Sequence, residues 1–173
     1  MLVTIRAVRR LFSTPRYSML DDVQSILRLK YAYFRLLDSK QFRDLGALFV
    51  ADGTTAYEAG TLHQSGREAI VDFLVSSLGD PGIITFHNGH HPEIDVASDG
   101  TATGIWYLED RVIVPAFDLV LAGTALYEDE YVVDDGEWRI RHTGYRRIYE
   151  ERRRMKTGEL ISFKSRFDDP TAS

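Results

Sequence analysis

The fold is decided by residues 101–149, which read TATGIWYLEDRVIVPAFDLVLAGTALYEDEYVVDDGEWRIRHTGYRRIY. β-branched and aromatic residues dominate three long stretches of this segment, and the turn sequence DDG at 134–136 separates the last two. Long stretches of this kind joined by short turns are typical of an antiparallel sheet. We therefore expect consecutive strands over 101–114, 119–133 and 137–149.

The residues before this segment predict helices. Residues 21–39 place apolar side chains three and four positions apart, interrupted only at Lys30, as an amphipathic helix does. A shorter helix is expected from Phe42 and a third one after Gly66. Further strands are expected over 54–59, 61–64, 83–87 and 93–97.

This order of elements indicates an α+β fold. Helices that precede a run of strands pack on one face of the resulting sheet. We expect N-terminal helices inside a strongly curved, mainly antiparallel sheet, which gives a cone-shaped fold with an open mouth. Such a mouth is a natural place for a central pocket that binds a small ligand.

Length and composition exclude several classes of protein. The chain has 173 residues, enough for one domain with a real core. It has no cysteine, which excludes disulfide scaffolds, thiolate metal sites and cysteine nucleophiles. Its net charge of −5 argues against nucleic acid as a partner, and no apolar run is long enough for a membrane span. We expect a cytoplasmic protein.

The two ends of the chain are basic. The first 20 residues carry four arginines and no acid, which is typical of a poorly ordered extension or of a mitochondrial transit peptide. We expect residues 1–20 to be an extension, 21–155 to form the cone-shaped domain, and 156–173 to be a solvated tail.

Several polar residues need a chemical explanation. Asp38 lies near the end of the predicted first helix, where a carboxylate opposes the helix dipole, and Tyr33 lies on a neighbouring stripe of that helix. Asp110 shares a strand face with Trp106, so burial of that face would require a partner for its carboxylate.

Three of the five histidines, His87, His90 and His91, fall within five positions. One interpretation is a metal site with Glu93 as a fourth ligand, but strand alternation points His90 away from the other two. The preferred interpretation is one catalytic imidazole, with no metal. The third interpretation is a polar loop whose histidines have no catalytic or ligand-binding role.

Two adjacent arginines, Arg146 and Arg147, occur in the last predicted strand. Alternation alone does not say which of them points inward. Together with the residues above, the inventory of tyrosine, histidine, carboxylates and an arginine is typical of acid–base catalysis.

Five segments carry a resemblance to known proteins. They are KYAYFRLLD at 30–38, HNGHHPEI at 87–94, TATGIWYLEDRV at 101–112, DGEW at 135–138 and TGYRRIYEE at 143–151. Over about residues 21–155 the chain resembles the nuclear transport factor 2-like (SnoaL-like) superfamily. Within it the closest resemblance is to the bile-acid 7α-dehydratases, and scytalone dehydratases are more distantly similar. The segment between Asp110 and Tyr127 differs from that of the bile-acid enzymes. The resemblance therefore implies their type of reaction but leaves the substrate open, with a steroid-like compound as one candidate.

The resemblance implies roles for individual residues. The catalytic positions it assigns are Tyr33, Asp38, His87, Asp110 and Arg147, which favours Arg147 over Arg146. Tyr57 is implied as a further pocket tyrosine, and we expect Trp106 to contact substrate as well.

The preferred hypothesis is a dehydratase that needs no cofactor and eliminates water from a small, hydrophobic, hydroxylated carbonyl compound. His87 would act as general acid and base, oriented by Asp38 or Asp110, while Tyr33 polarises the carbonyl with support from Arg147. The alternatives are an isomerase like the ketosteroid isomerases and a non-enzymatic ligand-binding or assembly subunit. A homo-oligomer is expected, with a trimer implied by the resemblance.

Overall fold

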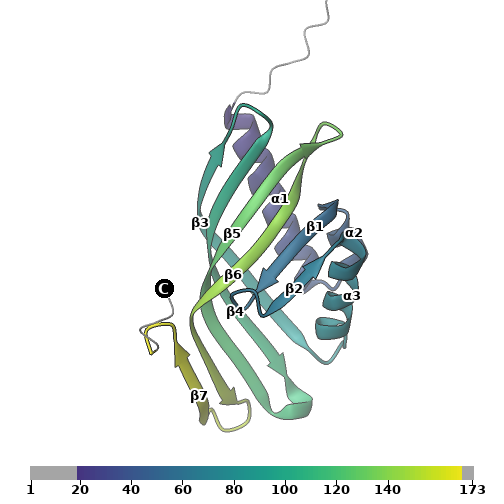
Figure 1. Ribbon diagram of the computed structural model, residues 1–173. Coiled ribbons are helices and arrows are strands. Elements are labelled where there is room, and N and C mark those ends of the chain that lie inside the picture. The colour runs from purple at the N-terminus through teal and green to yellow at the C-terminus, as the bar shows by residue number, and fades with distance from the viewer. Residues whose placement is uncertain (1–18, 169–173) are drawn as a thin grey trace, which may run out of the picture.

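The computed structural model describes residues 19–168, which form three α-helices packed against one seven-stranded sheet (Figure 1). In chain order the elements are α1 (Met19–Asp38), α2 (Phe42–Gly46), β1 (Phe49–Tyr57), β2 (Leu62–Ser65), α3 (Arg67–Leu78), β3 (Ile84–Val96), β4 (Thr101–Val114), the 3-10 helix η1 (Pro115–Phe117), β5 (Leu119–Asp134), β6 (Glu137–Arg154) and β7 (Leu160–Ser165).

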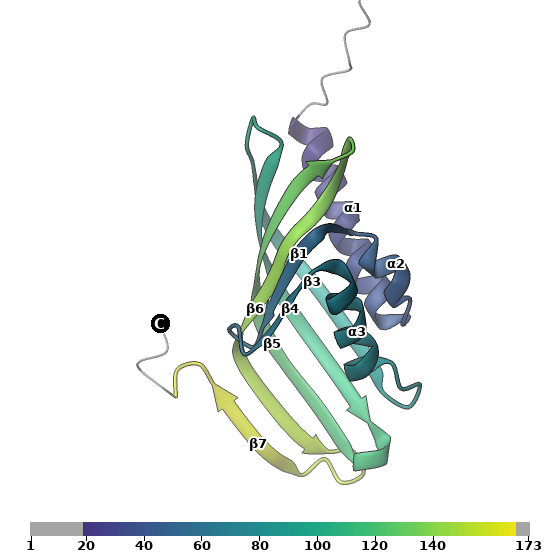
Figure 2. The same ribbon diagram turned by 45° about the vertical axis from the view of Figure 1, so that its right-hand side comes forward.

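The sheet has the strand order β2-β1-β6-β5-β4-β3, and β7 pairs with β6 as well. All neighbouring strands are antiparallel except β1 and β6, which run parallel. The sheet curves around the helices, which lie on one side of it, while β7 and the adjoining parts of β4, β5 and β6 extend beyond the helices (Figure 2). We call the face toward the helices the inner face and the opposite one the outer face. The predicted α+β fold is confirmed.

Periodicity explains which side chains form the core. Ile26, Tyr33 and Leu37 lie on one stripe of α1 and are almost completely buried. On β4 every second residue is buried, including Trp106 and Leu108, so this side of the strand faces the helices. The helix period and the strand period therefore point their apolar sides toward the same core.

The structure differs from the predicted strands at residues 83–97. One strand, β3, replaces the two that were expected, and its register with β4 shifts between His90 and Glu93. His91 has a φ of 51°, which breaks the alternation of side chains at this bulge.

The structure also corrects the expectation of a solvated tail after residue 155. β6 continues to Arg154, and β7 returns along it with Ser165 opposite Tyr149. The proposed extension at the N-terminus lies outside the described residues, apart from the first two residues of α1. Within residues 19–168, no helix has both the length and the apolar character needed to cross a membrane.

Candidate active site

A cavity of about 310 Å³ lies on the inner face of the sheet, beside α1 and α3. Polar side chains come from the helices, the strands and the turn after β1. They are Tyr33, Tyr57, Glu58, Ser77, His87, Asp110, Tyr127, Tyr145 and Arg147. The rest of the wall is mainly apolar, with Leu37, Leu62, Phe73, Leu74, Val112 and Leu121 among its residues. A mainly apolar wall with a few convergent polar groups is typical of a small-molecule site.

His87 of β3 is held by Asp38, the last residue of α1. Its Nδ1 lies 2.7 Å from Oδ1 of Asp38, and its backbone N–H donates to Oδ2 at 2.9 Å. Thr85 donates its hydroxyl to Oδ1 of the same carboxylate. The aspartate that pairs with His87, left open by the sequence, is therefore Asp38.

This pairing favours the charged form of Asp38 and fixes the tautomer of the His87 ring. Partial burial favours the protonated acid, but the hydrogen bonds from His87 and Thr85 and the attraction of the imidazole outweigh it, so the pKa of Asp38 is lowered. An ionised Asp38 accepts a hydrogen bond from Nδ1–H, and in that tautomer Nε2 is the proton acceptor of the ring. The arrangement supplies an oriented base at the cavity wall.

Tyr33 and Tyr57 form a hydrogen-bonded pair in the wall of the cavity. Their hydroxyl oxygens are 2.8 Å apart, and each residue is at most 4% exposed. Burial raises the pKa of Tyr33 and of Tyr57 well above the usual tyrosine value, so both remain phenols at neutral pH. The mutual bond uses one of the two hydroxyl protons, which leaves the other proton to donate elsewhere.

Asp110 and Arg147 form a bidentate ion pair across β5. The Nη1–Oδ1 and Nη2–Oδ2 distances are 2.5 and 2.8 Å, and Asp110 is 4% exposed. Gly123 lies between them on β5, where a Cβ atom would come within 3.0 Å of Nη1. Asp110 is also directly opposite His87 in the β3–β4 register. The interior carboxylate expected from the sequence has its partner.

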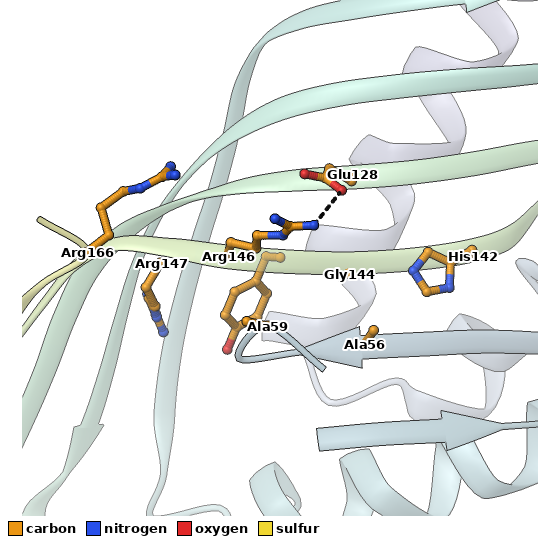
Figure 3. A pocket seen from close by; sticks show the side chains of 9 residues that line it. Ala56, Ala59, Glu128, His142, Gly144, Arg146, Arg147 and Arg166 are labelled. Atoms are coloured by element: carbon orange, nitrogen blue, oxygen red, sulfur yellow. Dashed lines mark ion pairs between the residues drawn. The ribbon is translucent and has the colours of Figure 1, made fainter. Parts of the chain in front are cut away.

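Arg146 and Arg147 point to opposite sides of β6 (Figure 3). Arg147 enters the inner cavity, whereas the half-exposed Arg146 points to the outer face and pairs with Glu128 at 3.7 Å. A second hollow of about 430 Å³ lies on that face, with Ala56 and Gly144 at the join of β1 and β6. It shares Tyr145 and Arg147 with the inner cavity but contains none of Tyr33, His87 and Asp110, so we place the candidate site in the inner cavity.

Trp106 is a correction to the predicted site. Its side chain is fully buried and does not line the cavity. The indole Nε1 donates to the hydroxyl of Tyr131 at 3.0 Å, and Tyr31 packs edge-on against the ring. Trp106 shares its face of β4 with Asp110, as expected, but four residues along the strand place it in the core.

The remaining histidines lie apart from the site. The two rings of His90 and His91 contact each other at the bulge, with their Nδ1 atoms 2.6 Å apart, and His90 stacks on Tyr107. Among residues 19–168, no three His, Asp or Glu side chains are grouped to hold a metal ion.

Three ionisable residues that line the cavity, Glu58, Tyr127 and Tyr145, were not predicted from the sequence. Tyr145 shares strand parity with Arg147, and Tyr127 is opposite Tyr145, so the alternation that selected the arginine also applies to both tyrosines. Glu58 belongs to the turn after β1, where no periodic pattern applies.

A buried ion pair, also missed, lies behind the tyrosines. Lys30 Nζ is 2.7 Å from Asp129 Oδ2, and both side chains are 0% exposed. Thr143 and Tyr131 each donate a hydroxyl to Asp129 at 2.6 Å. The ammonium of Lys30 lies 3.7 Å from the ring centre of Tyr127, so the cation also packs on the cavity's aromatic wall. Lys30, which interrupts the apolar stripe of α1, is therefore itself buried in the core.

Comparisons with known proteins agree with this architecture. Residues 18–144 match the family described as SnoaL-like domain. A candidate scytalone dehydratase from Novosphingobium aromaticivorans superposes with a TM-score of 0.70 at 24% identity, covering 76% of this chain and 87% of its own. The hexachlorocyclohexane dehydrochlorinase LinA-type3 from Novosphingobium barchaimii has a TM-score of 0.67 at 18% identity, covering 84% and 90%.

ActVI-ORFA from Streptomyces coelicolor has a TM-score of 0.62 at 22% identity, covering 72% of this chain and 96% of its own. At these identities the solved structures show a shared fold, and the family match extends over most of the chain. The chain belongs to the SnoaL-like family of nuclear transport factor 2-like folds.

Proposed function

We propose that the protein is a dehydratase that eliminates water from a small hydroxylated carbonyl compound, using its own side chains as acid and base. The observation that carries this proposal is the His87–Asp38 pair at a cavity whose wall also holds two hydrogen-bonded phenols. An oriented base and a nearby proton donor are the two groups that an elimination next to a carbonyl requires.

In the proposed reaction, Nε2 of His87 removes a proton from the carbon next to the carbonyl. The electron pair of that C–H bond moves toward the carbonyl, and the developing oxyanion accepts a hydrogen bond from the Tyr33–Tyr57 pair. When the C–OH bond breaks, the same imidazole returns its proton to the departing hydroxide. The products are one unsaturated carbonyl compound and one water, and the enzyme ends in its starting state.

Asp38 and Asp110 would have different tasks. Asp38 accepts a hydrogen bond from Nδ1–H, holds the ring orientation and stabilises the imidazolium that forms after proton removal. Asp110 is opposite His87 on the neighbouring strand, and Arg147 fixes its carboxylate. Because the Nη groups of Arg147 face Asp110, we assign Arg147 to holding this wall rather than to direct contact with the substrate carbonyl.

An isomerase on the same cavity is the second candidate. A buried carboxylate and a tyrosine pair would serve a proton transfer between carbons, and Asp110 with Tyr33 supplies these groups. The oriented imidazole of His87 would then have no task, which is why elimination is preferred. Product mass separates the two reactions, because isomerisation conserves the mass and dehydration lowers it by one water.

The test is mass spectrometry of the protein incubated with a panel of hydroxylated ketones, among them 7-hydroxy-3-oxo-Δ4 steroids. We expect loss of water with the wild type and a decrease in its rate of about 100-fold or more in His87→Ala, the range in which general acid–base groups contribute. His90→Ala is the matched control, because it removes a histidine of the same strand outside the cavity. Equal rates in the two variants would contradict the role of His87, and ligand binding without any change of mass would favour a binding protein.

We also propose that the protein forms a homo-oligomer, as expected from the sequence. Support comes from the outer strand β7, whose apolar side chains Leu160, Ile161 and Phe163 are about half exposed. Clustered exposed apolar side chains commonly mark contact surfaces between proteins. A monomer in sedimentation velocity at micromolar concentration would contradict this proposal.

A further inference from the structure

The inner cavity contains more carboxylates than cations. Among the described residues of its wall, Arg147 is the one arginine or lysine, whereas Glu58 and Asp110 each contribute a carboxylate. Two further acids stand just behind the wall: Asp38, which pairs with His87, and Glu150, whose Oε2 is 3.7 Å from Nε of Arg147. The presence of an arginine therefore does not make this cavity an anion receptor.

The donors of Arg147 already face carboxylates. Both terminal nitrogens donate to Asp110, and Nε approaches Glu58 at 3.4 Å and Glu150 at 3.7 Å. Burial lowers the pKa of Arg147, but the hydrogen bonds and the charge of Asp110 raise it further, so the guanidinium stays charged and paired. Its side chain is 14% exposed, which leaves little of it for an incoming anion.

Glu58 is the acid of this group with the greatest access to solvent. Its side chain is 36% exposed, against 4% for Asp110 and 11% for Glu150. The hydroxyl of Tyr145 donates to its Oε1 at 2.8 Å. Burial raises the pKa of Tyr145 above the usual value, so this hydroxyl remains a donor at neutral pH. The carboxylate is thus held at the wall and is still exposed to an entering ligand.

The backbone at Glu58 is itself unusual. Glu58, Ala59 and Gly60 have φ values of 51°, 54° and 88° in succession, and only the glycine adopts this region without cost. Strained turns of this kind cluster at functional sites, where the surrounding structure maintains them. Here the turn places the carboxylate of Glu58 in the cavity wall, one residue after Tyr57, the tyrosine that is hydrogen-bonded to Tyr33.

We propose that Glu58 is a specificity-determining residue that makes the cavity select uncharged ligands and reject those that carry a carboxylate or phosphate near the reacting ring. This inference rests on the proposed function in that it takes the same cavity as the substrate site. Inside the cavity an anionic group would meet Glu58 while Arg147 is already paired with Asp110. The other cations near Glu58 line the neighbouring hollow on its other side, and they are Arg152, Lys164 and Arg166. The repulsion is strong where water is partly excluded. An uncharged hydroxylated ketone meets no such penalty and can donate its hydroxyl to the carboxylate.

The test compares two ligands that differ in one charge. A 3-oxo-Δ4 steroid with a carboxylate at C7, in place of the hydroxyl that would leave, and its methyl ester are titrated into the wild type by calorimetry at low ionic strength. We expect the ester to bind about tenfold more tightly than the acid, the ratio that a difference of about 1.4 kcal/mol produces. Glu58→Gln keeps an oxygen acceptor for Tyr145 but removes the charge, and we expect it to reduce the ratio at least threefold by strengthening binding of the acid.

Glu128→Gln is the matched control, because it changes the net charge equally but lies on the outer face beside Arg146. We expect this variant to keep the wild-type ratio. Equal binding of acid and ester by the wild type, failure of the ester to bind, or an equal effect of both glutamine variants would each overturn the proposal. These measurements involve no turnover, so a charge preference here, together with no loss of water from any hydroxylated ketone in the mass-spectrometric assay, would refute the dehydratase and leave the ligand class standing.

Discussion

Replacing Lys30 by methionine tests the buried ion pair behind the cavity. Methionine has an unbranched side chain of similar length, so the substitution removes the ammonium and little of the packing. Burial lowers the pKa of Lys30, and the attraction and hydrogen bond of Asp129 offset part of this effect. Without Lys30, the carboxylate of Asp129 stays in the core with no cation beside it.

The structure sets the size of the expected loss. Removing one partner of a buried ion pair costs about 3–5 kcal/mol. Proton uptake limits the cost: at pH 7 an ordinary aspartic acid side chain can be protonated for about 4 kcal/mol. Asp129 also keeps the hydroxyl donors of Thr143 and Tyr131, so we expect the lower part of the range, about 3 kcal/mol. That is a large fraction of a total stability of about 5–15 kcal/mol.

The assay is urea unfolding of the wild type, Lys30→Met and the double variant Lys30→Met/Asp129→Asn, at pH 7 and at pH 5. The asparagine removes the uncompensated charge, so we expect the double variant to recover at least half of the loss at pH 7. Because protonating a carboxylate costs less at lower pH, the single variant should approach the double variant at pH 5. A loss below about 1 kcal/mol at pH 7, or the same gap between the variants at both pH values, would refute the reasoning.

Three further predictions concern the site and its supports. The lowered pKa of Asp38 stabilises the folded state above the reference value of 3.8 and ceases to do so as the pH falls through the folded-state value. The difference in unfolding free energy between wild type and Asp38→Asn should therefore shrink as the pH falls below the reference value of 3.8, and a constant difference in urea titrations would contradict this. Gly89→Ala should lower stability by about 1–3 kcal/mol, since the new Cβ would lie 2.2 Å from the ring of Phe34, and an unchanged urea midpoint would show that α1 moves freely. Ala59→Gly should raise stability by about 0.5–1 kcal/mol by relieving the positive φ of 54°, measured by the same method, whereas destabilisation would show that the turn is not strained.

Long periodic segments were predictable from the sequence. The stripe of α1 and the alternation along β4 fix the burial of Tyr33 and Asp110, because side-chain direction follows from the helix and strand periods. The same alternation cannot distinguish Arg146 from Arg147, since one residue of slip in register exchanges the faces. The resemblance to a family chose Arg147, and the structure agrees.

The residues that the sequence did not place correctly share one property, which is that their positions depend on local or long-range structure rather than on a repeating pattern. Trp106 and Asp110 share a face of β4, but alternation does not say where along the strand the cavity lies, so it cannot tell which of the two side chains lines it. Glu58 lies in a turn whose backbone departs from any repeating pattern. Lys30 interrupts an apolar stripe, and its partner Asp129 is 99 positions away, so only the three-dimensional structure joins them.

The parallel pairing of β1 with β6 has a consequence for how the chain acquires its structure during synthesis. β1 ends at Tyr57, and β6 begins at Glu137, so the ribosome must add most of the intervening sheet before the two can meet. Contacts between such distant segments slow folding, because a long loop must close before they form. A nascent chain that ends before β6 carries Tyr33, Asp38 and His87 yet lacks Tyr145, Arg147 and the strand that joins β1 to β5. The cavity is thus among the last features to form, and until β6 is made the edges of β1 and β5 that it later covers are exposed to pairing with other chains.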